Sequence, residues 1–224
     1  MKNINRDIKS NNSEYLLSLD VSTSTIGIAL FDIDTRKLKL LHHVSPKVKP
    51  KPESKMEELF KKVEIFEREF LSQYSNFNIT KVVIEEPLLQ SNNVYTIATL
   101  LRFNGMISKS IYETIGVVPD FISSYDARKF AFPELMAVRR FKKNGTQLSE
   151  KEIAKNSPVL FGAYDFDVDK KTVIFEKVCD LEPQILWLYD KHNKLKKENY
   201  DMSDAYCAGI GYMQKTGEWI QKKT

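Results

Sequence analysis

The sequence predicts an α/β domain built on a mixed five-stranded sheet, in which three antiparallel strands come first and parallel strands follow. Three short apolar runs, at 15–20, 26–31 and 38–44, are separated by polar segments, as in an antiparallel meander. Further along, the apolar runs 81–85 and 117–123 alternate with segments of helical pattern. Because such alternation is typical of parallel strands, the two patterns together predict a mixed sheet flanked by helices.

Helical patterns fill most of the remaining chain. Residues 54–57 (SKME) have the spacing of a capping box. An apolar stripe at helical spacing follows, made of Met56, Leu59, Phe60, Val63, Phe66 and Phe70. Further helices are predicted at 92–115, 126–130, 170–181 and 183–189, and a last helix from near Asp201 towards Lys215.

The chain of 224 residues is long enough to bury a core without disulfides or metals. Residues 1–13 are polar and are predicted to be a flexible tail, so that 14–224 form one domain. Within that domain, 133–168 fits no simple pattern and is predicted to be an insertion. Ser149 and Glu152 offer a capping box for a small helix inside it.

Two features bear on where the protein works. No apolar run approaches the roughly 20 residues that cross a bilayer, and the polar N-terminus lacks the apolar segment of a signal peptide. We therefore expect the protein to stay in the compartment where it is made. Cys179 and Cys207 are the only cysteines, and we expect them to be reduced and buried, with neither a disulfide nor a zinc site.

The basic residues are clustered along the chain. The formal net charge is +4, which is compatible with binding nucleic acid. Lysines and arginines gather at 47–55, 139–143, 170–171 and 191–197. Any one cluster is explained equally well by a solvated loop or helix face. Several clusters beside an acidic site favour a nucleic-acid partner.

That acidic site is predicted from carboxylates at the ends of three elements. Asp20 ends one apolar strand and Glu85 ends another. Asp201 and Asp204 stand three residues apart at the start of the last helix, where such side chains are neighbours. Mg²⁺ prefers oxygen ligands. Two such ions about 3.5–4 Å apart can activate a water and stabilise the leaving oxygen in phosphodiester cleavage. The acids therefore predict a magnesium site.

Each acid also has a purely structural interpretation. Asp20 can cap a turn, Asp201 can be a helix N-cap, and Asp204 suits a first helical turn because of the macrodipole. Glu85 is harder to explain this way, because an unpaired charge at the end of an apolar strand is costly. The combination of the four, in their order along the chain, is what favours a site.

The three acidic segments resemble, in order, motifs of the RuvC family of Holliday junction resolvases, which have the RNase H-like fold. LSLDVSTSTIGIALFD (17–32) resembles the first strand-turn-strand of the family, where an Asp ends one strand and a Gly lies in the next. VVIEEP (82–87) resembles the second acidic motif, and DMSDAYCAG (201–209) resembles the closing D-x-x-D-A motif. The resemblance runs from residue 15 to about 214, apart from 133–168.

This resemblance implies a catalytic site of Asp20, Glu85, Asp201 and Asp204. Asp20, Glu85 and Asp204 would hold two Mg²⁺ ions directly, with Mn²⁺ able to substitute, and Asp201 would complete the set. A metal-activated water would leave 5′-phosphate and 3′-hydroxyl ends. The implied function is a structure-selective endodeoxyribonuclease that resolves four-way DNA junctions. It would act in a bacterial cytoplasm or, for a phage protein, in the infected host.

The resemblance also implies a homodimer, because two-fold protein symmetry matches a two-fold junction. Helix 92–115 resembles the dimer helix of the family, and Gly105 would permit close approach. The alternative is that this helix only covers the sheet.

Residues that contact DNA are implied beside the acids. Family members often place an aromatic residue after the second acidic motif, whereas this chain has two leucines there, and a leucine wedge can also unstack bases. Basic residues after the later strand would contact phosphates. The implied DNA-binding residues are Leu88, Leu89, Asn92, Asn93, Arg128, Lys129, Lys170 and Lys171.

Three other functions remain open on the sequence. One is an RNase H-like nuclease of broader specificity, acting on branched DNA or on RNA. Another is an ATP-binding, kinase-like protein, since residues 20–27 also fit the phosphate loop of sugar kinases and actin-like proteins. A second glycine-rich loop is missing from the sequence, which disfavours it. The last is a non-catalytic binding module, disfavoured because all four acids are present.

Overall fold

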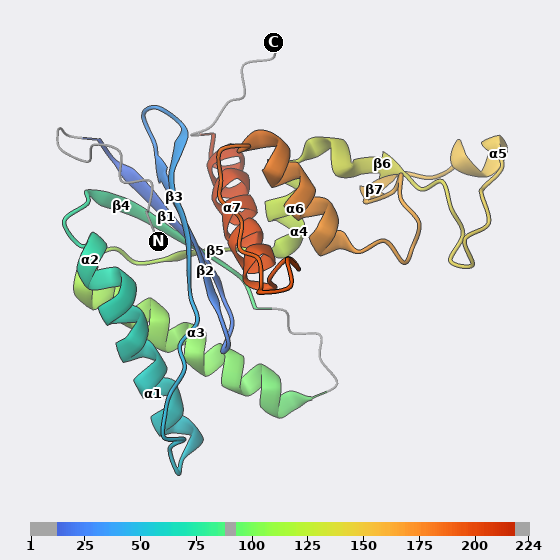
Figure 1. Ribbon diagram of the computed structural model, residues 1–224. Coiled ribbons are helices and arrows are strands. Elements are labelled where there is room, and N and C mark those ends of the chain that lie inside the picture. The colour runs from blue at the N-terminus through green and yellow to red at the C-terminus, as the bar shows by residue number, and fades with distance from the viewer. Residues whose placement is uncertain (1–12, 88–92, 218–224) are drawn as a thin grey trace.

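The computed structural model of the chain describes residues 13–87 and 93–217 (Figure 1). Its main sheet has five strands in the order β3-β2-β1-β4-β5. β1 (Tyr15–Val21), β2 (Ile26–Asp32) and β3 (Lys37–Val44) are antiparallel, whereas β4 (Ile79–Glu85) and β5 (Asp120–Ile122) extend the sheet in parallel from β1. The predicted fold class, a mixed sheet that begins with three antiparallel strands, is therefore confirmed.

Helices cover both faces of this sheet (Figure 1). On one face lie α1 (Lys55–Phe66), its π-helical continuation η1 (Glu67–Leu71), α2 (Ser72–Tyr74) and α3 (Val94–Ile115). On the other lie α4 (Ser124–Ala131), α6 (Lys170–Leu181) and α7 (Glu198–Lys215). Successive strand residues point to opposite faces, so Leu17 is buried on the α1 and α3 side while Leu16 is buried on the α7 side. None of the described helices has the length and apolar character to cross a membrane.

The helix starts follow the capping chemistry of the sequence. Ser54 caps α1 by accepting from the backbone N–H of Glu57 at 3.0 Å, as the capping-box spacing predicted.

The apolar stripe of α1 is only partly confirmed. Leu59, Phe66 and Phe70 are buried, but Met56 and Phe60 are 39% and 52% exposed. The sheet covers a narrower side of the helix than the stripe spans, so the residues at the stripe's edge stay in solvent.

The predicted helix at 183–189 is wrong. Pro183 disfavours helical backbone at Glu182, which ends α6 with φ −126° and ψ 61°. The segment instead forms a loop that returns through an isolated bridge between Tyr189 and Leu195. The Asn199 side chain closes the loop, accepting from Leu188 N at 2.9 Å and donating to Leu188 O at 2.7 Å.

Three smaller expectations also need correction. The last helix begins at Glu198, with Lys197 as its N-cap, so Asp201 lies inside the first turn and is not the cap. The strand predicted at 117–123 pairs with β4 over only three residues. Cys207 is buried as expected, but Cys179 is only partly buried, and neither forms a disulfide among the described residues.

The segment predicted to be an insertion has a structure of its own. It contains η2 (Pro133–Leu135), β6 (Met136–Val138), α5 (Glu150–Ile153) and β7 (Pro158–Leu160). β6 and β7 pair antiparallel in a second, two-stranded sheet. The predicted capping box of Ser149 and Glu152 is present at the start of α5. Residues 136–160, called the arm below, project from the body of the molecule (Figure 1).

Candidate active site

The sheet itself brings two of the four acids together. β1 and β4 are adjacent and parallel, with Leu19 paired to Ile84, so Asp20 and Glu85 follow at the same end of neighbouring strands. Leu19 and Ile84 are buried on the α1 and α3 side. Because side chains alternate along a strand, both carboxylates point to the opposite side, where α7 lies.

Two glycines let α7 approach the strands closely. Gly27 pairs with Asp20 across β1 and β2, and a Cβ built on it would lie 2.0 Å from the backbone oxygen of Asp201. Further along α7, a Cβ on Gly209 would lie 2.4 Å from the ring of Phe31. Ser18 also donates a hydrogen bond to the backbone oxygen of Ala205 at 2.7 Å. This close packing holds the Asp201 and Asp204 side of α7 over the end of β1.

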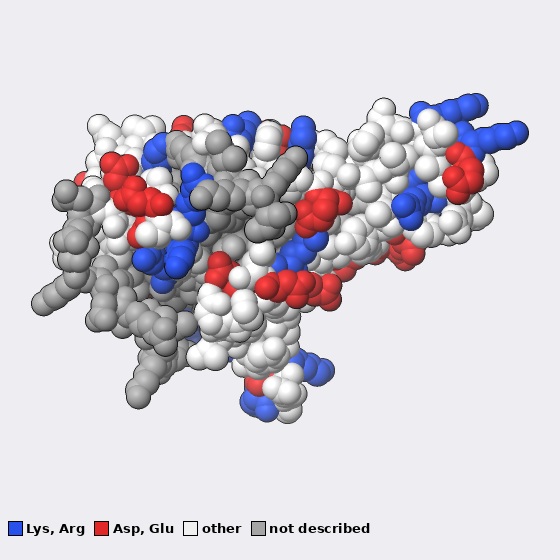
Figure 2. Space-filling model, turned by 90° about the horizontal axis from the view of Figure 1, so that it is seen from above, with Lys and Arg blue, Asp and Glu red and all other residues white. Residues whose placement is uncertain are grey.

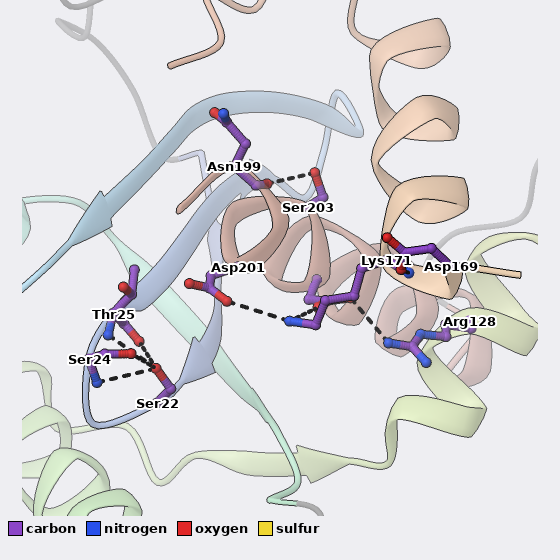
Figure 3. Close-up of polar contacts among 10 residues, drawn as sticks. Ser22, Ser24, Thr25, Arg128, Asp169, Lys171, Asn199, Asp201 and Ser203 are labelled. Carbon is purple, nitrogen blue, oxygen red and sulfur yellow. Dashed lines mark hydrogen bonds and ion pairs between the residues drawn. The ribbon is translucent and has the colours of Figure 1, made fainter. Parts of the chain in front are cut away.

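Two basic side chains reach the acids of α7 from neighbouring helices. Arg128 of α4 lies 3.3 Å from Asp204 through Nη2 and Oδ1. Lys171 of α6 lies 3.2 Å from Asp204 Oδ2 and 3.6 Å from Asp201 Oδ1. Figure 3 shows Lys171 pointing at Asp201, with Arg128 beside it on the α4 side. The Arg128 side chain is 15% exposed and that of Lys171 is 51% exposed.

The pKa values of three of the acids are raised, first by burial and then by the neighbouring carboxylates. Burial, together with the charges of Asp204 and Asp201, raises the pKa of Asp20 to about 8. Burial and the charges of Asp20 and Asp204 raise the pKa of Glu85 well above its usual range. The pKa of Asp201 is also raised by burial, although Lys171 opposes the shift. Burial is the largest cause of each rise, and repulsion from the neighbouring carboxylates adds to it.

The two cations respond in the opposite sense. Burial alone would lower the pKa of Arg128, but the charges of Asp204 and Glu85 raise it above its ordinary value. Lys171 behaves in the same way, because Asp204, Asp20 and Asp201 raise its pKa against the effect of burial. Both side chains therefore stay charged and act as internal counterions of the acidic group.

The donor set fits a hard divalent cation. It offers carboxylate oxygens from β1, β4 and α7, which are the ligands that Mg²⁺ prefers. In the described parts of the chain, no three acidic, histidine or cysteine side chains lie close enough together to form a ready metal site. Arg128 and Lys171 already neutralise part of the charge of Asp204. A metal ion bound here would have to replace part of that neutralisation.

The turn that follows Asp20 is built by the hydroxyl residues next to it. Ser22 Oγ donates to Thr25 O at 2.8 Å and accepts from Thr25 N at 3.1 Å (Figure 3). Lys62, which the sequence analysis did not single out, reaches across from α1 and donates to Thr23 O at 2.8 Å. Lys62 is hard to identify from the sequence, because it is buried in the structure but stands among the polar positions of an amphipathic helix.

The residues predicted to bind DNA fall into three groups. Leu88, Leu89 and Asn92 lie outside the described residues. Asn93 uses its side chain to cap α3, accepting from the backbone N–H groups of Tyr95 and Thr96. The basic residues differ from one another: Lys170 is exposed, and Lys129 is partly buried with its ammonium 5.5 Å from the Phe130 ring centre. Arg128 and Lys171 are the counterions described above, a role the sequence did not reveal.

Comparisons with known proteins were made by sequence and by structure. No protein-family model matches the chain, and no curated protein matches it by sequence. By structure, the chain is similar to Thermus thermophilus RuvC in complex with a Holliday junction substrate, with a TM-score of 0.52 and 11% identity over 92% of this chain and 97% of that one. The yeast mitochondrial Holliday junction resolvase Ydc2 gives a TM-score of 0.48 and 10% identity over 91% of this chain and 79% of that one. Together with the strand order, the similarity to RuvC shows that this chain has a RuvC-like, RNase H-like fold.

Proposed function

We propose that the protein is a divalent-metal-dependent endodeoxyribonuclease that cuts four-way DNA junctions. The observation that carries the proposal is the convergence of Asp20 and Glu85, from adjacent strand ends, on Asp201 and Asp204 of α7. A scaffold has no need for carboxylates that repel one another in this way. The fold shared with a RuvC that was solved with a Holliday junction substrate supports the choice of substrate.

In this proposal the four acids would hold two Mg²⁺ ions, with Mn²⁺ as a substitute. Bound there, Mg²⁺ supplies an activated water and stabilises the charge on the leaving oxygen. The protein's own part is to fix the carboxylates on rigid strands and a packed helix. Arg128, which is nearly buried, keeps its pairing with Asp204, while the half-exposed Lys171 is free to turn towards a substrate phosphate.

Cleavage of a synthetic four-way junction in Mg²⁺, with the cut sites mapped, tests the proposal directly. We expect paired cuts in opposite strands at the junction and little cutting of linear duplex of the same sequence. A flap, a Y-form and an RNA–DNA hybrid serve as further substrates. Equal rates on all of them would replace junction resolution with the second candidate, a nuclease of broader specificity that uses the same acids.

We also propose that the protein acts as a homodimer through α3. Val94, Tyr95 and Leu101 on this helix are exposed apolar side chains. No described atom lies within 4 Å of a Cβ built on Gly105, so this point of the helix is open. An open, partly apolar helix face is what a two-fold contact needs.

The variant Gly105→Glu tests this interface without disturbing the monomer. The new side chain meets open space, and glutamate is a better helix former than glycine by about 0.5–1 kcal/mol. We expect the wild type to sediment as a dimer and the variant as a monomer of equal or higher Tm. A variant that remains dimeric would exclude α3 as the contact.

A further inference from the structure

The arm is attached to the two helices that supply the counterions of the acidic site. One end of the arm follows α4, which carries Arg128, through the short turn η2. The other end leads through residues 161–169 into α6, which carries Lys171. The arm therefore joins the two helices that border the acids, and it extends outward from the body of the molecule (Figure 1).

The base of the arm is firmly held. Phe161 is buried in the core, and its N–H donates to Leu135 O at 2.8 Å. Arg139 donates to Phe161 O at 3.5 Å and to Tyr164 O at 3.3 Å. Its guanidinium also lies 4.2 Å from the ring centre of Phe166. The arm is thus fixed in direction where it leaves the body.

The rest of the arm has no core of its own. None of residues 136–160 is buried, and all of them lie in the described part of the chain. The ribbon is closed by backbone bonds, from Lys142 N to Thr146 O at 2.7 Å and from Leu148 N to Arg140 O at 2.8 Å. A two-stranded ribbon contributes little stability by itself. Packing therefore does not explain why the chain carries 25 residues here, counting from 136 to 160.

The charge of the arm is strongly one-sided. Residues 136–160 contain six basic side chains and two acidic ones, Glu150 and Glu152. Lys142 pairs with Glu152 at 3.0 Å. Among the described residues, the other exposed cations have no ion pair, and these are Arg140, Lys143, Lys151 and Lys155. Figure 2 shows basic side chains standing out at the end of the projection.

The lysines of α1, in the body of the molecule, are instead paired with acids. On α1, Lys55 and Lys62 pair with Glu58 at 2.9 and 2.7 Å, and Lys61 pairs with Glu57 at 2.6 Å. An array of unpaired cations on a fixed projection is suited to an extended polyanion. Duplex DNA offers one phosphate charge about every 1.7 Å along its axis.

We propose that the arm binds the phosphate backbone of a DNA duplex that leads away from the acidic site, through Arg140, Lys143, Lys151 and Lys155. The choice of DNA as the polyanion rests on the proposed function. The contact adds affinity that is independent of base sequence, because phosphates position a protein without specifying bases. It also orients the duplex, since the base of the arm is fixed to the helices of the site.

The test compares two variants of equal charge change. The arm variant is Lys143→Gln/Lys151→Gln/Lys155→Gln, and the control is Lys37→Gln/Lys61→Gln/Arg68→Gln, three basic residues on the body. Binding of a four-way junction and of a linear duplex is measured in EDTA by fluorescence anisotropy over a series of KCl concentrations. In EDTA the DNA stays uncut, so affinity is measured apart from cleavage.

We expect the arm variant to bind both DNAs at least about tenfold more weakly at 0.15 M salt, with a log Kd against log salt slope reduced by about 2–3. The control should change the slope by less than about 1. The Tm of the arm variant should match the wild type, because none of the three lysines is buried. If the arm variant had the same Kd and the same slope as the control, the proposal would be overturned. An arm that binds an acidic protein and does not bind DNA would give that result.

The outcome for the arm is separable from the outcome for the proposed function. If the wild type cuts no junction and the arm variant has lost affinity for duplex DNA, the nuclease proposal is wrong and the proposal that the arm binds DNA is supported. A wild type that cuts junctions, together with an arm variant that binds like wild type, leaves the nuclease proposal in place and overturns the arm.

Discussion

The acidic site and the arm place charge in opposite ways. At the site, carboxylates are packed under α7, and two basic side chains from other helices neutralise part of their charge. On the arm, cations stand in solvent and only Lys142 has an ion pair among the described residues. Charge taken out of water is costly unless it is paired, whereas exposed charge costs little. The carboxylates of the site therefore depend on the packing of the fold, whereas the cations of the arm need only to be exposed to solvent.

This contrast assigns the proposed cleavage chemistry to the acidic site and the proposed DNA affinity to the arm. Grouped, poorly solvated carboxylates bind a metal ion strongly because the ion relieves their repulsion. Exposed lysines interact through screened, long-range forces that depend on salt. Changes at the site should therefore alter cleavage and stability, while changes on the arm should alter DNA affinity alone.

The largest effect is expected for Asp20→Asn. Loss of this carboxylate would remove a proposed metal ligand, and we expect junction cleavage in Mg²⁺ to fall by about a thousandfold or more, in line with several kcal/mol of transition-state stabilisation. Junction binding in EDTA should persist. Asp34→Asn, an equal change at an exposed turn, is the control and should cut like wild type. Normal cleavage by Asp20→Asn would refute the site.

Gly27→Ala tests how the fold assembles the site. The added Cβ would lie 2.0 Å from Asp201 O, so α7 must move away from β2. Overpacking of this kind costs about 1–3 kcal/mol, and sometimes more, and the shift separates the acids as well. Urea unfolding and junction cleavage should both show a loss. Gly105→Ala, at a helix position that is open in the monomer, should instead gain about 0.5–1 kcal/mol when both proteins are compared as monomers. Equal stabilities of the two variants would contradict the close approach of α7.

Much of the fold and of the acidic group could be predicted from the sequence, because both depend on local patterns. Asp20 and Glu85 end apolar strands, and such strands pair in parallel when helices separate them. Gly27 corresponds to the glycine of the first family motif. The close approach of α7 explains why a residue without a side chain stands there. Each of these signals can be recognised from a few neighbouring residues or from a fixed spacing, although the residues concerned meet only in the fold.

The features that could not be predicted depend on contacts between distant segments. Arg128 and Asp204 are 76 residues apart, and nothing in either segment indicates that they meet. The loop after Pro183 has the composition of a helix, but the Asn199 side chain holds it in another conformation. The arm lacks periodic burial altogether, so no pattern of apolar residues could reveal it.

A largely buried and an exposed arginine provide a direct comparison between the site and the arm. Arg128→Met leaves Asp204 with Lys171 as its remaining cationic partner, so the loss of stability should lie near the lower end of the roughly 3–5 kcal/mol that breaking a buried pair costs. Arg140→Met on the arm should change stability by less than about 0.5 kcal/mol, while weakening DNA binding. Urea unfolding in EDTA measures the first effect, and anisotropy in EDTA measures the second. Similar stability losses in the two variants would contradict the distinction between the regions.

A further expected effect is a dependence of stability on pH in the metal-free protein. The folded protein holds the pKa of Asp20 at about 8, against about 3.8 for an ordinary aspartate. The folded state therefore keeps a proton that the unfolded state has lost, and the stabilisation present below pH 4 disappears as the pH rises to 8. Glu85, whose pKa is also raised, acts in the same direction.

Thermal unfolding in EDTA between pH 5 and 8 measures this effect. About 1.4 kcal/mol is lost for each pH unit between the two pKa values, and each kcal/mol is worth about 2–4 °C. We therefore expect the wild-type Tm to fall by on the order of 10 °C, and the Tm of Asp20→Asn to fall less. His42 and His43 oppose the trend, because burial lowers their pKa values, but they are present in both proteins and cancel in the difference. Added Mg²⁺ at pH 8 should restore the wild-type Tm more than that of the variant, since a bound ligand stabilises the folded state. Equal pH slopes in the two proteins would mean that Asp20 is not part of a repulsive group, and the reason for expecting a metal ion there would be lost.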